Sequence, residues 1–230
     1  MPKLVIISEE WMPRDWHGVQ GKERRWRTDD DGIHVKGEKK QRRTKGRPST
    51  IRRIRKRFGN TITNMSEMFG IGEPMLAATI AIESGGKPKA ERFEKHLADY
   101  SIGLMQTLTS TAYAVGVRIG IPTVSKSPDN QKPYAMPDKT APKGSDVDEW
   151  RRFLSRPWNS IGIGAAYHQM NNTRFKLQLD PVLLYCSYNA GSARVHKSSA
   201  NQWGVHHYGG ALDWFVKWFN DACAVYGRSM

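Results

Sequence analysis

From Asn60 onward, apolar residues recur three and four positions apart, which is the spacing of a helix with one buried face. Proline near the start and glycine near the end of several of these segments are typical helix boundaries. The pattern therefore predicts an all-α domain. The expected helices cover residues 62–69, 74–83, 105–115, 159–170, 181–188 and 210–226.

The first 58 residues lack this regularity. Residues 4–7 have the composition of a short strand. Near the end of the segment, Ile51, Ile54 and Phe58 are spaced for one face of a helix, so a short basic amphipathic helix is expected over 49–58. The isolated apolar anchors of this segment are Trp11, Trp16 and Trp26.

A long connection between residues 121 and 150 interrupts the helical pattern. It contains several lysines, few apolar residues and five prolines. Long connections without secondary structure are uncommon inside compact domains and are usually functional or mobile. The prolines are Pro122, Pro128, Pro133, Pro137 and Pro142.

The net charge of +14 is concentrated at the start of the chain. Up to Phe58 there are 18 Lys and Arg against 8 Asp and Glu, a net of +10, whereas the remainder has 18 against 14, a net of +4. Such a segment favours anionic partners such as phosphate-rich outer leaflets, teichoic acids or nucleic acid. We therefore divide the chain into a basic N-terminal extension, residues 1–58, and a helical domain, residues 59–230.

A chain of 230 residues is long enough to bury the core of one domain. It has no run of about 18 apolar residues, so no membrane-spanning segment is expected. The first residues have too short an apolar stretch for a secretory signal, and acids follow at once, so we expect action where the protein is made or export by other means. Cys186 and Cys223 are too few for a disulfide framework and are predicted to be buried free thiols.

Glu83 is the strongest candidate for chemistry. It closes the apolar run that follows Pro74, and it lies three residues after Ile80 and seven after Leu76, on the same helical face. A carboxyl among aliphatic groups is desolvated, which raises its pKa towards neutrality. Glu83 is therefore predicted to be a general acid.

Three further motifs follow Glu83 in a fixed order. Residues 103–106 are Gly-Leu-Met-Gln, residues 159–167 are Asn-Ser-Ile-Gly-Ile-Gly-Ala-Ala-Tyr, and residues 188–191 are Tyr-Asn-Ala-Gly. In this order the motifs resemble those of the lytic transglycosylase and goose-type lysozyme family, over about residues 75–226. The resemblance implies a lysozyme-like helical fold, and it implies that the connection at 121–150 is an insertion.

The resemblance also implies a reaction. The substrate would be peptidoglycan, cleaved between N-acetylmuramic acid and N-acetylglucosamine. Glu83 would protonate the leaving oxygen and then return as a base, deprotonating the C6 hydroxyl of the muramic acid to close a 1,6-anhydro ring. The substrate-binding residues would be Ser84, Met105, Gln106, Tyr188, Asn189 and Ala190.

Some of these residues have specific expected roles. The Gln106 amide would hold an N-acetyl or hydroxyl group, while Met105 would pack either on a sugar face or in the core. The Tyr188 hydroxyl would orient the Glu83 carboxyl, and residues 189–191 would form a turn that lets the backbone approach the glycan.

A second carboxylate would favour hydrolysis instead of anhydro-ring formation. Asp99 is the candidate, although hydrogen bonding within its loop is the alternative interpretation. Its spacing differs from that of goose-type lysozymes, which favours a lytic transglycosylase over a muramidase. Glu91 and Glu94 are interpreted as solvated neighbours of basic residues.

No metal or organic cofactor is implied, because the spacing of the candidate zinc ligands matches no known pattern. Trp214 and Trp218 lie four residues apart and would either stack on sugars or pack in the core or against a partner. The zinc candidates are His196, His206, His207 and Cys223.

The basic extension and the expected chemistry together suggest a phage cell-wall-degrading enzyme. It would be made in the host cytoplasm and act on the cell wall, either as an endolysin or as a virion component. The competing hypothesis is a structural virion protein with a secondary lysozyme-like domain. In that case residues 1–58 would dock to virion proteins or packaged DNA.

Overall fold

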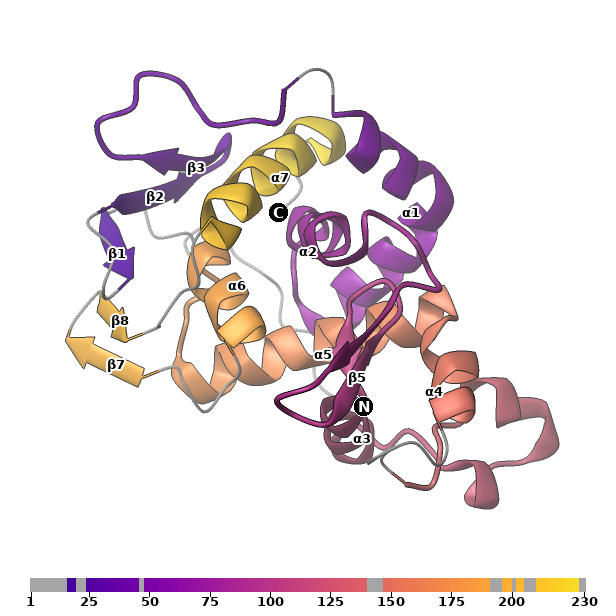
Figure 1. Ribbon diagram of the computed structural model, residues 1–230. Helices are drawn as coiled ribbons and strands as arrows, with labels where there is room; N and C mark the ends of the chain where they lie inside the picture. The colour runs from indigo at the N-terminus through magenta and orange to yellow at the C-terminus, as the bar shows by residue number, and fades with distance from the viewer. Residues whose placement is uncertain are drawn as a thin grey trace. The chain divides into compact units, whose positions relative to one another are not determined.

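A computed structural model describes residues 16–19, 24–45, 48–139, 147–190, 196–199, 202–204 and 210–227. The strand expected at 4–7 and Trp11, Pro142, Gly191, His206 and His207 lie outside these ranges. The helices and strands labelled in Figure 1 fall into two compact units. The first comprises Met1–Ile82 with Tyr167–Met230, and the second comprises Glu83–Ala166.

The first unit is built around α2 (Glu73–Ser84). Every residue from Met75 to Ala81 is buried. A helix that is apolar on all sides has no solvent face, so it must lie in a core. Its last two residues, Glu83 and Ser84, are counted with the second unit.

The basic segment before α2 forms one long helix, α1 (Ser49–Phe69). The short helix expected at 49–58 and the segment expected at 62–69 are therefore continuous, and the predicted boundary between residues 58 and 59 falls inside α1. Gly70 ends the helix in the left-handed conformation, with φ of 63°, and its N–H donates to Ser66 O at 2.8 Å. The buried stripe consists of Ile51, Ile54, Phe58, Ile62 and Met65.

A five-stranded sheet completes the first unit with α6 (Pro181–Ala190) and α7 (Ala211–Tyr226). The strand order is β3-β2-β1-β8-β7, in which β1 and β8 are parallel and the other pairs are antiparallel. The sheet was not predicted, because strands of three to five residues carry almost no periodic signal. Its strands are β1 (His17–Val19), β2 (Arg25–Asp29), β3 (Gly32–Val35), β7 (His196–Ser199) and β8 (Gln202–Gly204).

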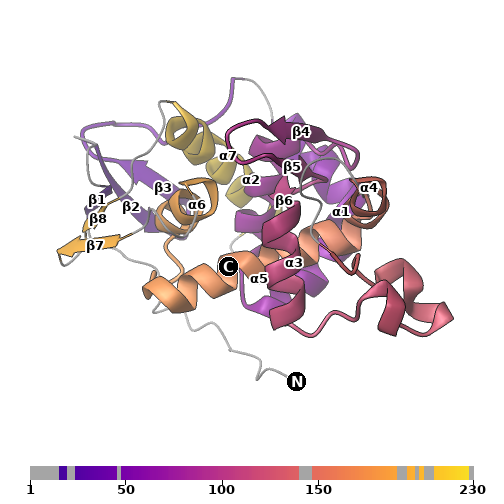
Figure 2. The same ribbon diagram turned by 60° about the horizontal axis from the view of Figure 1, so that its bottom comes forward.

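The sheet and the segment after it are fixed to α7, beside which they lie in Figure 2. The Asn220 side chain accepts from Ile33 N at 2.7 Å and donates to Ile33 O at 2.9 Å and Arg42 O at 2.7 Å. The buried Asp221 pairs with Arg43 at 3.0 Å. Trp26 of β2 is fully buried. The described residues before α1 therefore share a core with the C-terminal helix.

The second unit contains a three-stranded antiparallel sheet and the helices α3 (Thr109–Arg118), α4 (Val147–Leu154) and the first part of α5 (Pro157–Phe175). A helix was expected from residue 105, but α3 begins at Thr109. Gly103 and Gln106 have φ of 85° and 46°, which a right-handed helix cannot contain. The strands are β4 (Glu91–Glu94), β5 (Asp99–Ile102) and β6 (Thr107–Leu108).

The connection at 121–150 contains more structure than was predicted. It forms two 3₁₀ turns, η2 (Val124–Lys126) and η3 (Asp129–Tyr134), and its last residues begin α4. Met136 packs so closely on α3 that a Cβ on Gly116 would lie 2.5 Å from its sulfur. The buried Trp150 donates to Lys139 O at 2.8 Å. The described part of the connection is therefore packed against α3 and α4.

The helical character is confirmed, while the two sheets correct the all-α assignment. Helices expected at 74–83, 159–170, 181–188 and 210–226 correspond to α2, α5, α6 and α7. Cys186 and Cys223 are buried free thiols, as predicted. Among the described residues, no helix is both long enough and apolar enough to cross a bilayer.

Candidate active site

Glu83 lies in the last turn of α2, directly before a tight reversal of the chain. Gly85 and Gly86 make this reversal with φ of 60° and 78°. The Glu83 side chain keeps partial solvent exposure. Burial of its carboxyl raises the pKa of Glu83 from 4.5 to about 7, an effect opposed by the charge of Arg92 and reinforced by that of Glu94. Near pH 7 the carboxyl therefore exists both with and without its proton.

Ser84 holds the turn that follows Glu83. Its hydroxyl oxygen accepts from Gly86 N at 3.2 Å, and its carbonyl accepts from Lys87 N at 3.2 Å. The Ser84 side chain is buried. These bonds fix the direction in which the chain leaves α2, while contact between Ser84 and the substrate stays a prediction.

The β4–β5 hairpin carries a hydrogen-bonded cluster that the sequence did not indicate. Arg92 and Glu94 alternate on β4, and Ser101 lies opposite Arg92 on β5. Glu94 Oε1 accepts from Arg92 Nε at 2.5 Å and from Ser101 Oγ at 3.1 Å. The side chain of Glu94 is only 15% exposed. Hydrogen bonds therefore fix the Glu94 carboxylate in place, and its charge raises the pKa of Glu83. The interpretation of Glu94 as a solvated neighbour is wrong.

Glu91 also has a defined partner instead of being freely solvated. Its carboxylate accepts two hydrogen bonds from Arg151 of α4, at 2.7 Å each. The Arg151 guanidinium also lies 5.8 Å from the centre of the Tyr100 ring. This fork joins the hairpin to α4 and thereby fixes the strand that carries Arg92 and Glu94.

Gln106 binds the loop before it. Its Nε2 donates to Ala90 O at 2.9 Å and to Gly103 O at 3.0 Å. An amide nitrogen has two hydrogens, so both are used in these bonds. A sugar would therefore meet the amide oxygen of Gln106, which is an acceptor for an N-acetyl N–H or a hydroxyl.

Met105 is a core residue. It is completely buried, and its N–H donates to Ser160 Oγ at 3.2 Å. A Cβ on Gly164 of α5 would lie 2.5 Å from the Met105 methyl group. This packing supports the core alternative for Met105, and it explains why glycine stands at position 164.

Asp99 fixes the start of α3. Its carboxylate accepts from the hydroxyl of Thr109, from Ser110 Oγ at 2.6 Å and from Ser110 N at 3.1 Å. It also accepts from Tyr100 N at 2.6 Å. The residue is buried and both of its oxygens are engaged, which supports the structural alternative for Asp99 over the catalytic one.

In the first unit, Tyr188 rests on a fixed aromatic platform. Its ring stacks on His168 with centres 4.4 Å apart and lies 5.3 Å from Tyr167. His168 is fully buried beside the hydroxyl of Thr79, at 3.2 Å. Burial lowers the pKa of His168 to about 3, so the ring beneath Tyr188 is neutral.

Asn189 and Ala190 form the last turn of α6, where a non-helical turn was expected. Asn189 is exposed at this end of the helix. Glu83 belongs to the second unit and Tyr188 to the first. The expected contact between the Tyr188 hydroxyl and the Glu83 carboxyl stays a prediction.

The family of transglycosylase SLT domains matches residues 60–135 and 134–206, which together are more than half of the chain. The chain belongs to this family. No curated protein matches it closely enough to add a more specific assignment. The family membership identifies a lysozyme-like lytic transglycosylase domain whose substrate is peptidoglycan.

The two matched segments of the SLT domain meet at residues 134 and 135, inside the connection. Glu83 and Gln106 lie in the first segment, and Tyr188, Asn189 and Ala190 lie in the second. The match begins within α1, so the strands β1 to β3 lie outside it.

The charges of the hairpin predict opposite effects on the pH profile of the SLT domain. Arg92 lowers the pKa of Glu83 and Glu94 raises it. The alkaline limb of activity should therefore move to higher pH in Arg92→Gln and to lower pH in Glu94→Gln, each by up to about one unit because water screens both groups. The measurement is kcat/KM against pH on soluble glycan chains. Shifts of both variants in one direction would contradict this assignment.

Trp214 of α7 is not a core residue, since the residue is 52% exposed and Lys217 Nζ lies 4.5 Å from its ring centre. Trp218 is half-buried. For Trp214 the packing alternative within the core is therefore wrong. Stacking on a sugar or contact with a partner remains the prediction.

Proposed function

We propose that this SLT domain cleaves the β-1,4 bond between N-acetylmuramic acid and N-acetylglucosamine without water. Glu83 donates its proton to the glycosidic oxygen as the bond to C1 of muramic acid breaks. The resulting carboxylate then takes the proton of the C6 hydroxyl, whose oxygen bonds to C1 and closes the 1,6-anhydro ring. The observation that carries this proposal is the pKa of about 7 for Glu83, which suits one group to both steps.

The hydrogen bonding of the neighbouring carboxylates supports this single-residue mechanism. A hydrolase that uses two carboxyl groups needs the second one to activate water or attack the sugar. Both oxygens of Asp99 are engaged at the start of α3. One oxygen of Glu94 accepts from both Arg92 and Ser101, which balances its charge. These arrangements favour a structural role for Asp99, and for Glu94 an effect on the pKa of Glu83.

The product of digestion tests the proposal directly. Muropeptides released from purified sacculi and reduced with borohydride should appear about 20 mass units below their hydrolytic counterparts, because the anhydro form lacks water and cannot be reduced. Mass spectrometry of wild type and Asp99→Asn gives the comparison. Reducing ends as the main wild-type product, lost in Asp99→Asn, would make the protein a muramidase.

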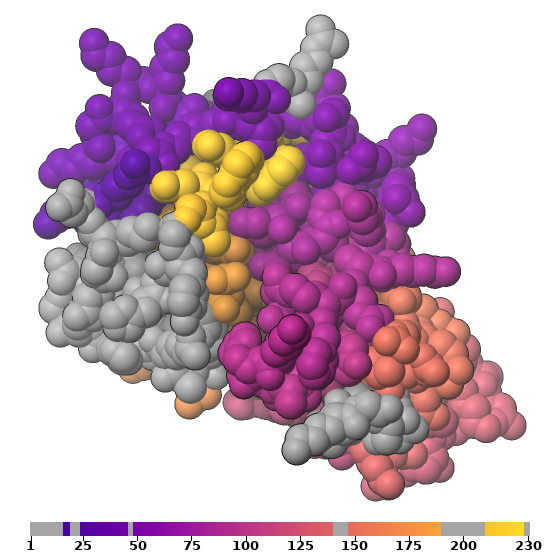
Figure 3. All heavy atoms as spheres, in the orientation of Figure 1, coloured from indigo at the N-terminus to yellow at the C-terminus, as the bar shows by residue number. Residues whose placement is uncertain are grey.

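We also propose that α1 attracts the enzyme to anionic envelopes, as would suit a phage endolysin or a virion-borne wall-degrading enzyme acting at the cell wall. The cations of α1 lie opposite its buried stripe. Figure 3 shows that the purple part of the chain, which includes the start of α1, bears long side chains that project from the surface near α7. Dense positive charge on one helical face attracts polyanions. The exposed cations are Arg52, Arg53, Arg55, Lys56 and Arg57.

Neutralising part of this face should weaken action on intact envelopes and leave the turnover of soluble glycan fragments unchanged. The test variant replaces Arg52, Lys56 and Arg57 by Gln. Arg55 is retained because it donates to Val225 O and lies over the Tyr226 ring. Wild type and variant should converge as salt rises from about 0.05 to 0.5 M, where the Debye length falls towards about 4 Å.

A matched control replaces three exposed cations of the second unit with Gln. If the control loses as much envelope activity as the α1 variant at low salt, net charge and not the α1 face determines the attraction. The control positions are Arg118, Lys126 and Lys139.

A further inference from the structure

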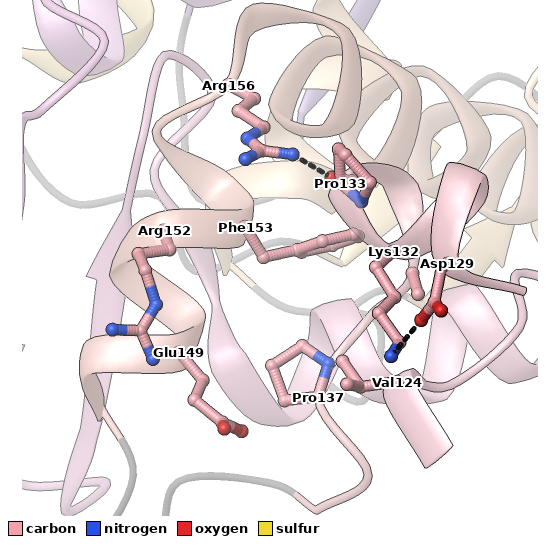
Figure 4. Close-up of a pocket in the computed structure, with 10 residues that line it drawn as sticks. Val124, Asp129, Lys132, Pro133, Pro137, Glu149, Arg152, Phe153 and Arg156 are labelled. Carbon is pink, nitrogen blue, oxygen red and sulfur yellow. Dashed lines mark hydrogen bonds and ion pairs between the residues drawn. The ribbon is translucent and has the colours of Figure 1, made fainter. Parts of the chain in front are cut away.

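A cavity of about 410 Å³ lies between the connection and α4, within the second unit. Its apolar lining includes Phe153 of α4 with Ala135 and Pro137 of the connection. Figure 4 shows the Phe153 ring crossing the middle of the pocket, with charged side chains around it. Pockets that bind small ligands combine such an apolar floor with a few polar groups, and their volumes begin at about 300 Å³.

The walls of this pocket are fixed before any ligand binds. The carbonyl of Pro133 accepts from the Arg156 guanidinium and from Asn159 Nδ2, the latter at 3.3 Å. The same Asn159 nitrogen donates to Phe153 O at 3.0 Å, which ties the connection to the end of α4. Met136 N donates to Pro122 O at 3.0 Å. A ligand would therefore not have to order this part of the connection on binding.

Two of the charged groups around the pocket are available to a ligand. Lys132 pairs with Asp129, and one nitrogen of Arg156 donates to Pro133 O, which directs this guanidinium towards the connection. Within the described part of the chain, neither Arg152 nor Glu149 forms an ion pair, with each other or with a third residue. Both are exposed and both project from α4 at the pocket (Figure 4).

An unpaired cation and an unpaired anion beside an apolar floor are complementary to a short zwitterionic peptide. Arg152 can bind a carboxylate through two parallel N–H donors, and Glu149 can accept from an ammonium group. Phe153 would pack against the aliphatic part between the two charges. In peptidoglycan the carboxyl of muramic acid is joined to the stem as an amide, so the peptide-bearing glycan itself has no charge to satisfy either group.

We propose that this pocket binds the peptide stems of peptidoglycan, at a diamino acid that carries a free carboxylate and a free amine. The proposal rests on the proposed function, which makes peptidoglycan the substrate. In this arrangement the connection recognises the peptide, while the carboxyl of Glu83, at a separate place, cleaves the glycan. Binding of a stem at this position would raise the affinity for peptide-bearing strands without changing the chemical step.

Binding of a sugar-free stem tetrapeptide, measured by isothermal titration calorimetry, tests the pocket without any cleavage. Arg152→Gln and Glu149→Gln should each weaken binding by about tenfold or more, because each removes a charge-assisted hydrogen bond. Arg118→Gln, an exposed cation of α3, is the matched control and should bind as wild type does. Acetylating the side-chain amine of the diamino acid in this peptide should remove the effect of Glu149→Gln and preserve that of Arg152→Gln.

A second variant, Val124→Phe, tests the cavity itself, since Val124 lines the pocket and is only partly buried. Filling the space should weaken peptide binding while leaving both charges in place. On sacculi, these variants should raise KM and leave kcat unchanged. On glycan strands stripped of their peptides they should match wild type. Circular dichroism establishes that each variant is folded.

The outcomes separate this inference from the proposed function. No peptide binding by wild type, or equal binding by Arg152→Gln, would overturn the pocket assignment even if cleavage gives anhydro products. Peptide binding that depends on Arg152 in a protein without glycan cleavage would support the pocket and overturn the proposed function. Glu83→Gln should bind the peptide as wild type does, because Glu83 does not line the pocket.

Discussion

Glu83→Gln is expected to reduce the clearing of sacculi by about a thousandfold or more, since the amide keeps the shape of the side chain and cannot transfer its proton. Glu83 is the one described carboxyl whose pKa burial raises to about 7. No other group in the proposed mechanism supplies both the proton and the base. Clearing rates of labelled sacculi measure the effect, and activity retained at a tenth of wild type would refute the assignment.

Stability measured at two pH values provides the control for this variant. Because the pKa of Glu83 is higher in the folded protein than its ordinary value of 4.5, the stability that protonation contributes is fully present below about pH 4.5 and is lost as pH rises through about 7. Glu83→Gln should therefore equal wild type near pH 4 and exceed it by about 3 kcal/mol near pH 8. Denaturant unfolding measures this difference. A variant that is less stable at both pH values would show that its lost activity reflects damage to the fold.

The placement of Glu83 was predictable because the signal that carries it is local. The helix α2 is an unbroken apolar run that ends in two glycines, so sequence spacing alone puts Glu83 beside Ile80. Glu94 was missed for the opposite reason. Its strand has four residues, too few to show an alternating pattern, and its partner Ser101 is set by the register of β5.

One short motif gave two different outcomes. Residues 103–106 were expected to contribute both Met105 and Gln106 to the substrate cleft. The left-handed backbone of Gly103 and Gln106 turns the chain so that Met105 enters the core, while Gln106 binds the loop. A motif fixes which residues are present, but the direction of each side chain depends on a backbone conformation that sequence spacing does not reveal.

The N-terminal strands could not be predicted from the sequence, because their partners are distant along the chain. Gly18 pairs with Gln202 across the sheet, and Ile33 bonds to Asn220. No periodic signal connects such positions, and the density of basic residues suggested an extension separate from the helical domain. The described residues before α1 contribute instead to the core of the first unit, through Trp26 and Ile33.

Deleting residues 1–58 is therefore expected to unfold the first unit instead of releasing an intact catalytic domain. Burial of a large apolar side chain contributes about 1.5–3 kcal/mol, so losing five of them costs about 10 kcal/mol, comparable with the whole stability of a typical domain. The deletion also leaves the buried Asn220 and Asp221 without the partners described above. The buried side chains that the deletion removes include Trp26, Ile33, Ile51, Ile54 and Phe58.

Circular dichroism and thermal unfolding of the truncated protein measure this effect. A graded companion is Asn220→Ala, which removes one side chain and should cost about 2–4 kcal/mol, because Ile33 N, Ile33 O and Arg42 O lose their bonds in a buried site. Lys36→Ala, on the exposed turn after β3, is the control and should change little. If the truncated protein unfolds cooperatively near the wild-type temperature and cleaves soluble glycan at the wild-type rate, the basic segment is an appendage that the fold does not need. Its contribution would then be attraction to the envelope and not the fold that holds Tyr188 and His168.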